Sequence, residues 1–212
     1  MAIKPILFNT EMVRAILDRR KTCTRRVIKL PENMDGIPVG KGGDSSNPLG
    51  FMYPGCIKRP QYQPGDILYV RETWKKAPNG YYYYEDWKRN DIADVTKWKP
   101  SIRMPKEAAR IWLKVTDVRV ERLQEMKPVD VIKEGAYPDC WDCLNTYGES
   151  GSQCCYGTEE QCSQCDEVMM EWEKLWNSTI KKSDIDRYGL DANPWVWVIE
   201  FERCEKPQTM WE

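Results

Sequence analysis

Hydrophobic positions recur along the chain at helical spacing in three places. In residues 11–20, Val13, Ile16 and Leu17 follow the i, i+3, i+4 pattern of an amphipathic helix, and Thr10 is a candidate N-cap. The same reasoning predicts a short helix over 126–136, with Gly135 as its C-cap, and a longer helix over 166–178.

Alternation between apolar and polar residues predicts the strands. Ile111, Leu113 and Val115 fall on one face of a long strand over residues 110–122. Residues 193–203 are apolar on both faces, which is typical of a central strand. Shorter strands are predicted over 4–8, 22–30, 64–74 and 81–86.

The order of these elements predicts an α+β fold, in which a mixed β-barrel or curled sheet has helices at its edge. The length of 212 residues fits one domain with insertions or two small domains, and the pattern of elements favours the first. That domain comprises 1–137 and 166–212, and a cysteine-rich module over 138–165 is inserted into it. Residues 31–64 are rich in Gly, Pro, Ser and Asn without periodicity, which predicts a long loop excursion.

Composition narrows the classes of function. The net charge of −1 means that any contact with nucleic acid has to come from a local basic patch. No run of 18 apolar residues predicts a membrane span, and the first residues lack the apolar core of a signal peptide, so a cytoplasmic protein is expected. The chain has no histidine, which excludes nucleophiles activated by an imidazole of this chain and leaves lysine, carboxylate, threonine, cysteine or metal.

The cysteines follow the spacing of a structural zinc site. Two CxxC pairs enclose 18 residues, which matches the C-x2-C-x15–20-C-x2-C pattern. The predicted ligands are Cys140, Cys143, Cys162 and Cys165, with Cys154 or Cys155 as alternates. Two disulfides formed on oxidation are the other interpretation. Cys23 stands apart, and packing is favoured over reactivity for it.

A cationic stretch over residues 19–26 contains candidate residues for nucleophilic catalysis and anion binding. Lys21 and Thr24 are spaced so that their side chains can meet. A threonine hydroxyl needs a base to become a nucleophile, and a buried lysine among arginines has a lowered pKa that suits this role. Arg25 and Arg26 are candidates to hold a phosphate or an oxyanion. The alternative is a helix end with cations followed by a strand.

The stretch ILDRRKTCTRRVIK resembles the opening motif of the ASCH domain family, in which a helix ends in a G/R-x-K-T-x-T-x-R pattern. The similarity continues through PGDILYVRE, VTDVRVERLQ, VIKEGA and PWVWVIEFER, and it is greatest to the larger ASCH proteins of phages and prophages. This resemblance implies a PUA-like β-barrel.

The characterised bacterial members of that family are N4-acetylcytidine amidohydrolases. Their catalytic lysine, threonine and glutamate match Lys21, Thr24 and Glu134. The resemblance implies that Thr24 attacks the acetyl carbonyl and that Lys21 acts as base. It implies that Glu134 protonates the leaving amine or orients the substrate.

Three further residues are candidate ligand contacts. Glu72 would lie in the mouth of the barrel and pair with an arginine, or form a surface ion pair of little energetic weight. Arg71 is its neighbour, and Trp74 would stack on a base unless it belongs to the core.

Three functions follow as hypotheses. One is an amidohydrolase that removes an acyl group from a modified cytidine. Another is a non-catalytic module of phage origin that binds RNA or a modified base. The third is an accessory protein whose zinc module holds a protein partner that the sequence does not specify.

Overall fold

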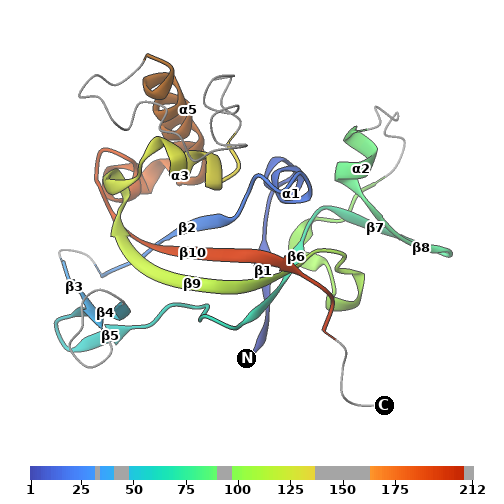
Figure 1. Ribbon diagram of the computed structural model, residues 1–212, viewed down its shortest axis with the longest axis horizontal. Helices are drawn as coiled ribbons and strands as arrows, with labels where there is room; N and C mark the ends of the chain where they lie inside the picture. Colours follow the sequence, from blue (N-terminus) through green and yellow to red (C-terminus); the bar gives the residue numbers. More distant parts are fainter. Residues whose placement is uncertain (32–33, 41–47, 90–96, 137–162, 208–212) are drawn as a thin grey trace, which may run out of the picture.

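The computed structural model describes residues 1–31, 34–40, 48–89, 97–136 and 163–207 (Figure 1). A mixed five-stranded sheet lies at its centre, in the order β1-β6-β9-β10-β2. Its strands are β1 (Ile3–Leu7), β6 (Ile67–Arg71), β9 (Trp112–Arg122), β10 (Trp195–Cys204) and β2 (Cys23–Val27). Only β1 and β6 pair in parallel. The predicted α+β class is confirmed.

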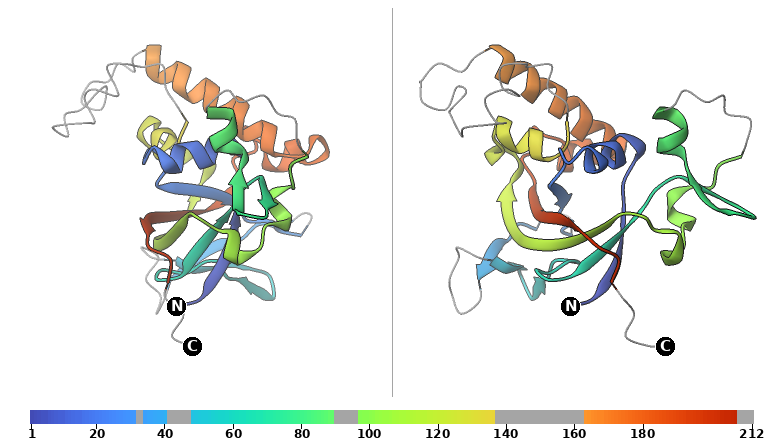
Figure 2. Two further views of the ribbon diagram at one scale, coloured as in Figure 1. Left: turned by 90° about the vertical axis from the view of Figure 1, so that its right-hand side faces the viewer. Right: turned by 45° about the vertical axis from the view of Figure 1, so that its right-hand side comes forward.

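The sheet is curled, and its two edge strands approach each other. The long strands β9 and β10 bend across the molecule (Figures 1 and 2). Nη2 of Arg26 on β2 donates to the carbonyl of Leu7 on β1 at 3.1 Å. Within the described ranges no ladder of hydrogen bonds joins β1 to β2, so the sheet is open there. Of the mixed β-barrel and the curled sheet that the sequence predicted, the structure shows the curled sheet and no closed barrel.

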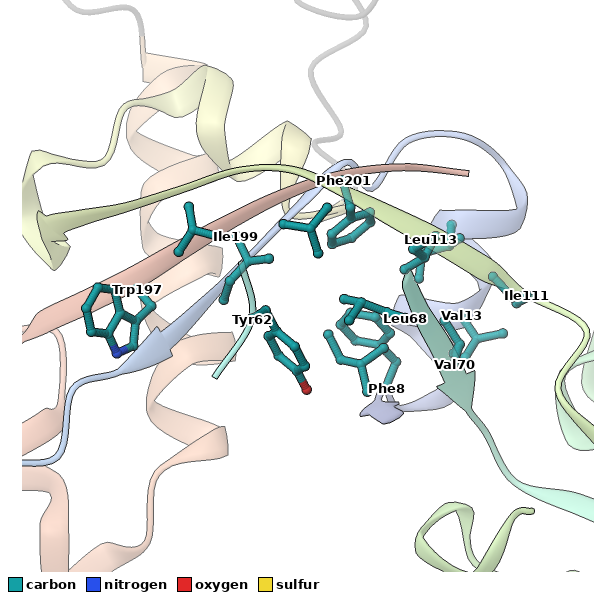
Figure 3. Packing of buried hydrophobic residues seen from close by; sticks show 14 of the residues in the cluster. Phe8, Val13, Tyr62, Leu68, Val70, Ile111, Leu113, Trp197, Ile199 and Phe201 are labelled. Carbon is teal, nitrogen blue, oxygen red and sulfur yellow. The ribbon is translucent and has the colours of Figure 1, made fainter. Parts of the chain in front are cut away.

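The main core fills the concave face of this sheet (Figure 3). Alternate residues of β10 point into it, and the residues between them point to the opposite face, so β10 is buried on both sides as predicted. The fully or nearly buried members of this core include Leu68, Val70, Ile111, Leu113, Val115, Trp197, Ile199 and Phe201. Burial of these apolar side chains is the main force that holds the sheet in its curl.

Two helices cover the other face of β10. These are α3 (Pro128–Lys133) and α5 (Ser163–Thr179). Val168, Trp172 and Trp176 of α5 pack with Val196 and Val198, as the helical spacing predicted. None of the described helices is long and apolar enough to cross a membrane.

The first helix begins earlier than predicted. Helix α1 spans Thr10–Leu17, and its N-cap is Asn9, whose side-chain oxygen accepts a hydrogen bond from the Met12 N–H at 2.8 Å. An asparagine caps at least as well as a threonine, which explains the shift. The helix also ends before Arg19, which has a left-handed backbone with φ of 62°.

The prediction of a loop over 31–64 is wrong for three segments, which form an antiparallel sheet. They are β3 (Ile37–Gly40), β4 (Pro48–Tyr53) and β5 (Cys56–Lys58). Phe51 of this sheet is fully buried, whereas Met52 and Ile57 are exposed. Because apolar side chains of this sheet occur at exposed as well as buried positions, its sequence lacks the alternation that reveals a strand.

A hairpin extends the molecule at the end away from β3–β5 (Figure 1). It consists of β7 (Trp74–Ala77) and β8 (Gly80–Tyr83), and helix α2 (Tyr84–Arg89) follows directly. The strand predicted over 81–86 therefore ends at Tyr83. The remaining short helices are η2 (Ser101–Arg103), η3 (Lys106–Ala108), η4 (Leu123–Glu125), η5 (Lys182–Asp184) and α6 (Ile185–Tyr188).

A buried carboxylate fixes the start of the sheet and should make its stability depend on pH. Asp66 accepts hydrogen bonds from Lys4 Nζ at 2.7 Å, from the Ala2 N–H at 2.9 Å and from the Gln63 N–H at 3.1 Å. Burial on its own would raise the pKa of Asp66, but Lys4 and the two N–H groups outweigh it and lower that pKa.

We expect the free energy of unfolding to contain an Asp66 contribution that is complete above about pH 4. It is lost as pH falls through the lower pKa of the folded state. Urea unfolding across the acid range should show this loss for the wild type and a flatter profile for Asp66→Asn. Asp191→Asn changes an exposed carboxyl and should keep the wild-type profile. Equal profiles for all three proteins would contradict the prediction.

Candidate functional site

A small cleft lies along the outer edge of β2, between the junction of β1 with α1 and the side of α5. Its volume is about 130 Å³. Five of its polar lining residues come from the cationic stretch or from the end of α3. Lys21, Thr24, Arg25 and Glu134 are buried, whereas Arg26 is exposed. The aromatic part of its wall comprises Phe8, Trp172 and Trp176.

Lys21 and Glu134 form a buried ion pair at the centre of the cleft. Lys21 Nζ donates to Glu134 Oε2 at 2.8 Å and to the Glu134 carbonyl at 2.7 Å. The side chains are 1% and 3% exposed, so water contributes little to either charge. Backbone contacts hold the two segments together, because the Thr22 N–H donates to the carbonyl of Lys133 at 2.8 Å.

Gly135 allows α3 to end against α1. Its φ is +86°, in the left-handed region that glycine tolerates. A Cβ at this position would lie 2.6 Å from the Cβ of Ala15 and 2.9 Å from the Cβ of Lys21, which is closer than side chains pack. The predicted helix end at Gly135 is confirmed, and it positions Glu134 over the Lys21 ammonium.

Arg25 is an internal residue and does not reach out to solvent. Its Nη1 donates to Glu134 Oε1 at 3.2 Å and its Nη2 to Glu121 Oε2 at 3.2 Å. Asp130 lies 3.7 Å from the same Nη2. Burial lowers the pKa of Arg25, but Glu134 and the other carboxylates outweigh it and raise that pKa. The guanidinium therefore stabilises Glu134, and the phosphate contact expected from the sequence would need these bonds to break.

Thr24 and Arg26 alternate with Arg25 on β2 and face the opposite way. They pair across the sheet with Ile199 and Trp197 of the main core. Lys21 donates to Glu134. Within the described part of the chain no hydrogen bond engages the Thr24 hydroxyl. Arg26 is exposed, and its guanidinium lies 5.8 Å from the centre of the Phe8 ring.

Cys23 has the packing role that the sequence favoured. It is buried on the side of β2 that faces the helices. Burial, with a contribution from Glu134, raises the pKa of the Cys23 thiol to about 12. A thiol that stays protonated is a poor nucleophile, so Cys23 does not supply the chemistry of the cleft.

The other three candidate contacts do not line this cleft. Glu72 is buried and forms a two-pronged ion pair with Arg110, with both distances 2.9 Å. Burial raises the pKa of Glu72, although Arg110 opposes the rise. Arg71 stacks on the Tyr69 ring, and Trp74 belongs to a separate apolar cluster beneath the β7–β8 hairpin.

Sequence reasoning missed the partners of the central carboxylate and part of the wall. Glu121 and Asp130 were read only as strand and helix residues, and Trp172 and Trp176 only as core. No sequence signal identified these partners, because the sequence does not show that Arg25 is buried. Its burial in the structure explains the carboxylates around it, since a buried guanidinium requires them nearby.

The position of the predicted zinc module relative to this cleft is not described by the structure. Cys140, Cys143, Cys154, Cys155 and Cys162 lie outside the described residues. Cys165 lies in the first turns of α5, and its side chain is not among those described. The zinc site stays a prediction.

No protein-family model matches the chain, and neither a curated protein nor a solved structure matches it. The functional argument therefore rests on the geometry of the cleft and on the sequence motifs that form it.

Proposed function

We propose that the cleft recognises a nucleobase and removes an acyl group from its exocyclic amine, with N4-acetylcytidine as the first substrate to test. The observation that carries this proposal is the convergence of Lys21, Thr24 and Glu134 in one buried cleft, although 113 residues separate Lys21 from Glu134. This is the set of residues that the resemblance to ASCH amidohydrolases implies. The curled sheet is compatible with the PUA-like fold of that family, which is part of the proposal.

The size and polarity of the cleft suit part of a nucleoside. Its volume of about 130 Å³ is smaller than the ~300–1,000 Å³ of sites that enclose a whole ligand. A base edge would enter while the sugar stays outside. The Glu134 carboxylate is an acceptor for the N4–H of a cytosine, and the exposed guanidinium of Arg26, which lies 5.8 Å from the centre of the Phe8 ring, offers a stacking surface.

The ion pair provides a route for the proton in the reaction. Lys21 would pass a proton to Glu134 along their 2.8 Å hydrogen bond and become a neutral amine. That amine takes the proton of Thr24 as the hydroxyl oxygen attacks the acyl carbonyl. Glu134 then gives its proton to the departing N4 amine as the C–N bond breaks, and water hydrolyses the threonine ester.

A second function is favoured by one feature of the same site. Glu134 engages both Lys21 and Arg25, and within the described ranges neither cation donates a hydrogen bond to the Thr24 hydroxyl. A site held in this state would bind a base without reacting, which is the behaviour of a module that reads RNA or a modified base. In both versions the structural zinc held by Cys140, Cys143, Cys162 and Cys165 remains part of the proposal.

Release of acetate from N4-acetylcytidine by the full, zinc-supplemented chain is the test of the proposal. We expect turnover that yields cytidine and acetate in equal amounts. Equilibrium binding of N4-acetylcytidine, cytidine and uridine, measured in parallel, separates the two versions. Binding of the cytosine nucleosides without turnover would favour the module that only reads the base. Neither binding nor turnover by a folded sample would reject both.

A further inference from the structure

A second hollow lies next to the cleft and shares Arg26 with it. Its volume is about 270 Å³. Trp197 and Tyr62, both buried in the main core, also line it. Its cationic residues are Arg26, Lys29, Lys58 and Arg59, and we call this hollow the basic groove.

The cations of the basic groove are not neutralised, unlike four buried or partly buried cations elsewhere in the protein. Lys21, Arg25, Arg110 and Arg119 all pair with carboxylates. By contrast, none of the four groove cations has a carboxylate within ion-pair distance in the described ranges, and the groove lining contains no acidic residue. Lys58 Nζ donates to the carbonyl of Lys29, and Arg26 donates to that of Leu7, so both engage neutral acceptors and keep donors to spare.

Two segments far apart in the sequence build the groove. Arg26 and Lys29 come from β2 and its continuation, whereas Lys58 and Arg59 come from the end of β5. Tyr62 anchors the second segment, because its buried hydroxyl donates to the carbonyl of Pro5 at 2.8 Å. The cations of β5 are thereby held beside the mouth of the cleft and are not spread over the surface.

We propose that the basic groove binds the phosphate of a nucleotide whose base occupies the cleft, so that a single-stranded nucleic acid is bound more tightly than the free nucleoside. This inference rests on the proposed function. Four cations without a carboxylate partner in the described ranges complement the negative charge of backbone phosphates, and phosphate contacts position a strand without reading its sequence. A base reaches a buried cleft only when it has left a stack, which favours a single strand over a duplex.

The test compares binding of a short, fluorescently labelled single-stranded RNA containing N4-acetylcytidine to two variants across a range of salt concentrations. In the groove variant, Lys58→Gln with Arg59→Gln, two phosphate contacts are lost. At roughly 0.7 per contact, the slope of log affinity against log salt should become shallower by about 1.4. Its affinity near ~0.1 M salt should fall by roughly 10- to 30-fold.

The matched control is Lys76→Gln with Arg103→Gln, which removes one lysine and one arginine at the opposite end of the molecule. Both side chains are exposed, and neither has an ion pair in the part of the chain that the structure describes. The control should keep the wild-type affinity and slope. Equal losses in both variants would show a general charge effect and overturn the proposal.

Two further ligands distinguish the phosphate of a strand from that of a mononucleotide. They also distinguish failure of the groove inference from failure of the proposed function. If N4-acetylcytidine 5′-monophosphate competes as well as the RNA, the groove binds a mononucleotide and the strand is excluded. If the free nucleoside is turned over but the groove variant binds and processes RNA like the wild type, the groove inference fails and the proposed function stands. If RNA binds through the groove with no preference for cytosine bases, the inference about phosphate stands and the proposed function fails.

Discussion

Glu134→Ala is expected to lower the free energy of unfolding by about 3–5 kcal/mol, because it leaves two buried cations without their carboxylate. Lys21 and Arg25 have side chains that are 1% exposed, so water cannot replace the lost acceptor. Lys21 would keep only its bond to the main-chain carbonyl of residue 134. The pair thus shows the asymmetry of buried ion pairs, in which removal of one partner costs far more than the intact pair contributes.

Urea unfolding of three variants checks this expectation. Glu134→Gln keeps the shape of the side chain but not its charge, and it should cost less than Glu134→Ala. Glu171→Ala is the control, because Glu171 pairs with Lys174 on the exposed face of α5 and such pairs contribute about 1 kcal/mol or less. Addition of Lys21→Met to Glu134→Gln should restore part of the loss, since it removes one uncompensated charge. A Glu134→Ala protein as stable as Glu171→Ala would contradict the ion-pair argument.

The elements that the sequence predicted best are those whose side chains divide sharply between core and solvent. Residues 110–122 contain Ile111, Leu113 and Val115 at alternate positions, and all three are buried in the main core. The helix over 166–178 presents Trp172 and Trp176 to one cluster. In both segments burial repeats with the period of the backbone, so the pattern can be read without knowledge of the neighbours.

The strands that were not predicted lack this sharp division between buried and exposed side chains. In β4 Phe51 is fully buried while the neighbouring apolar residue Met52 is exposed, so the strand shows no apolar face in the sequence. The curvature of the sheet also could not be predicted from the sequence. The approach of Arg26 to Leu7 depends on how far β9 and β10 bend, which a pattern of apolar positions does not encode.

The candidate site was likewise predicted only in part from the sequence. Motif similarity pointed to Lys21, Thr24 and Glu134, and the structure brings them to one cleft. Sequence reasoning expected the arginines around Lys21 to dominate its surroundings, but Glu134 is its ionic partner. Alternation along β2 separates Arg25 from Thr24 and Arg26, yet it cannot tell which face meets the carboxylates of α3 and β9. That choice is made by long-range packing.

Thr24→Val is expected to lower turnover of N4-acetylcytidine by about 10³-fold, or roughly 4 kcal/mol of transition-state stabilisation, if the proposed function holds. Valine replaces the hydroxyl with a methyl group in nearly the same volume, so the cleft keeps its shape while the nucleophile is lost. Because no described hydrogen bond engages this hydroxyl in the free protein, its removal leaves no buried partner unsatisfied, and the fold should be retained.

Steady-state kinetics of Thr24→Val beside two comparison variants test this prediction. Thr24→Ser keeps a hydroxyl at the same position and should retain a measurable fraction of turnover. Thr116→Val makes the identical change on the exposed side of β9, outside the cleft, and should turn over like the wild type. Binding of N4-acetylcytidine should survive in Thr24→Val, because Glu134 and the aromatic wall are untouched. Wild-type turnover in Thr24→Val would remove Thr24 as the nucleophile and leave Glu134, with its neighbouring ammonium, to activate a water molecule instead.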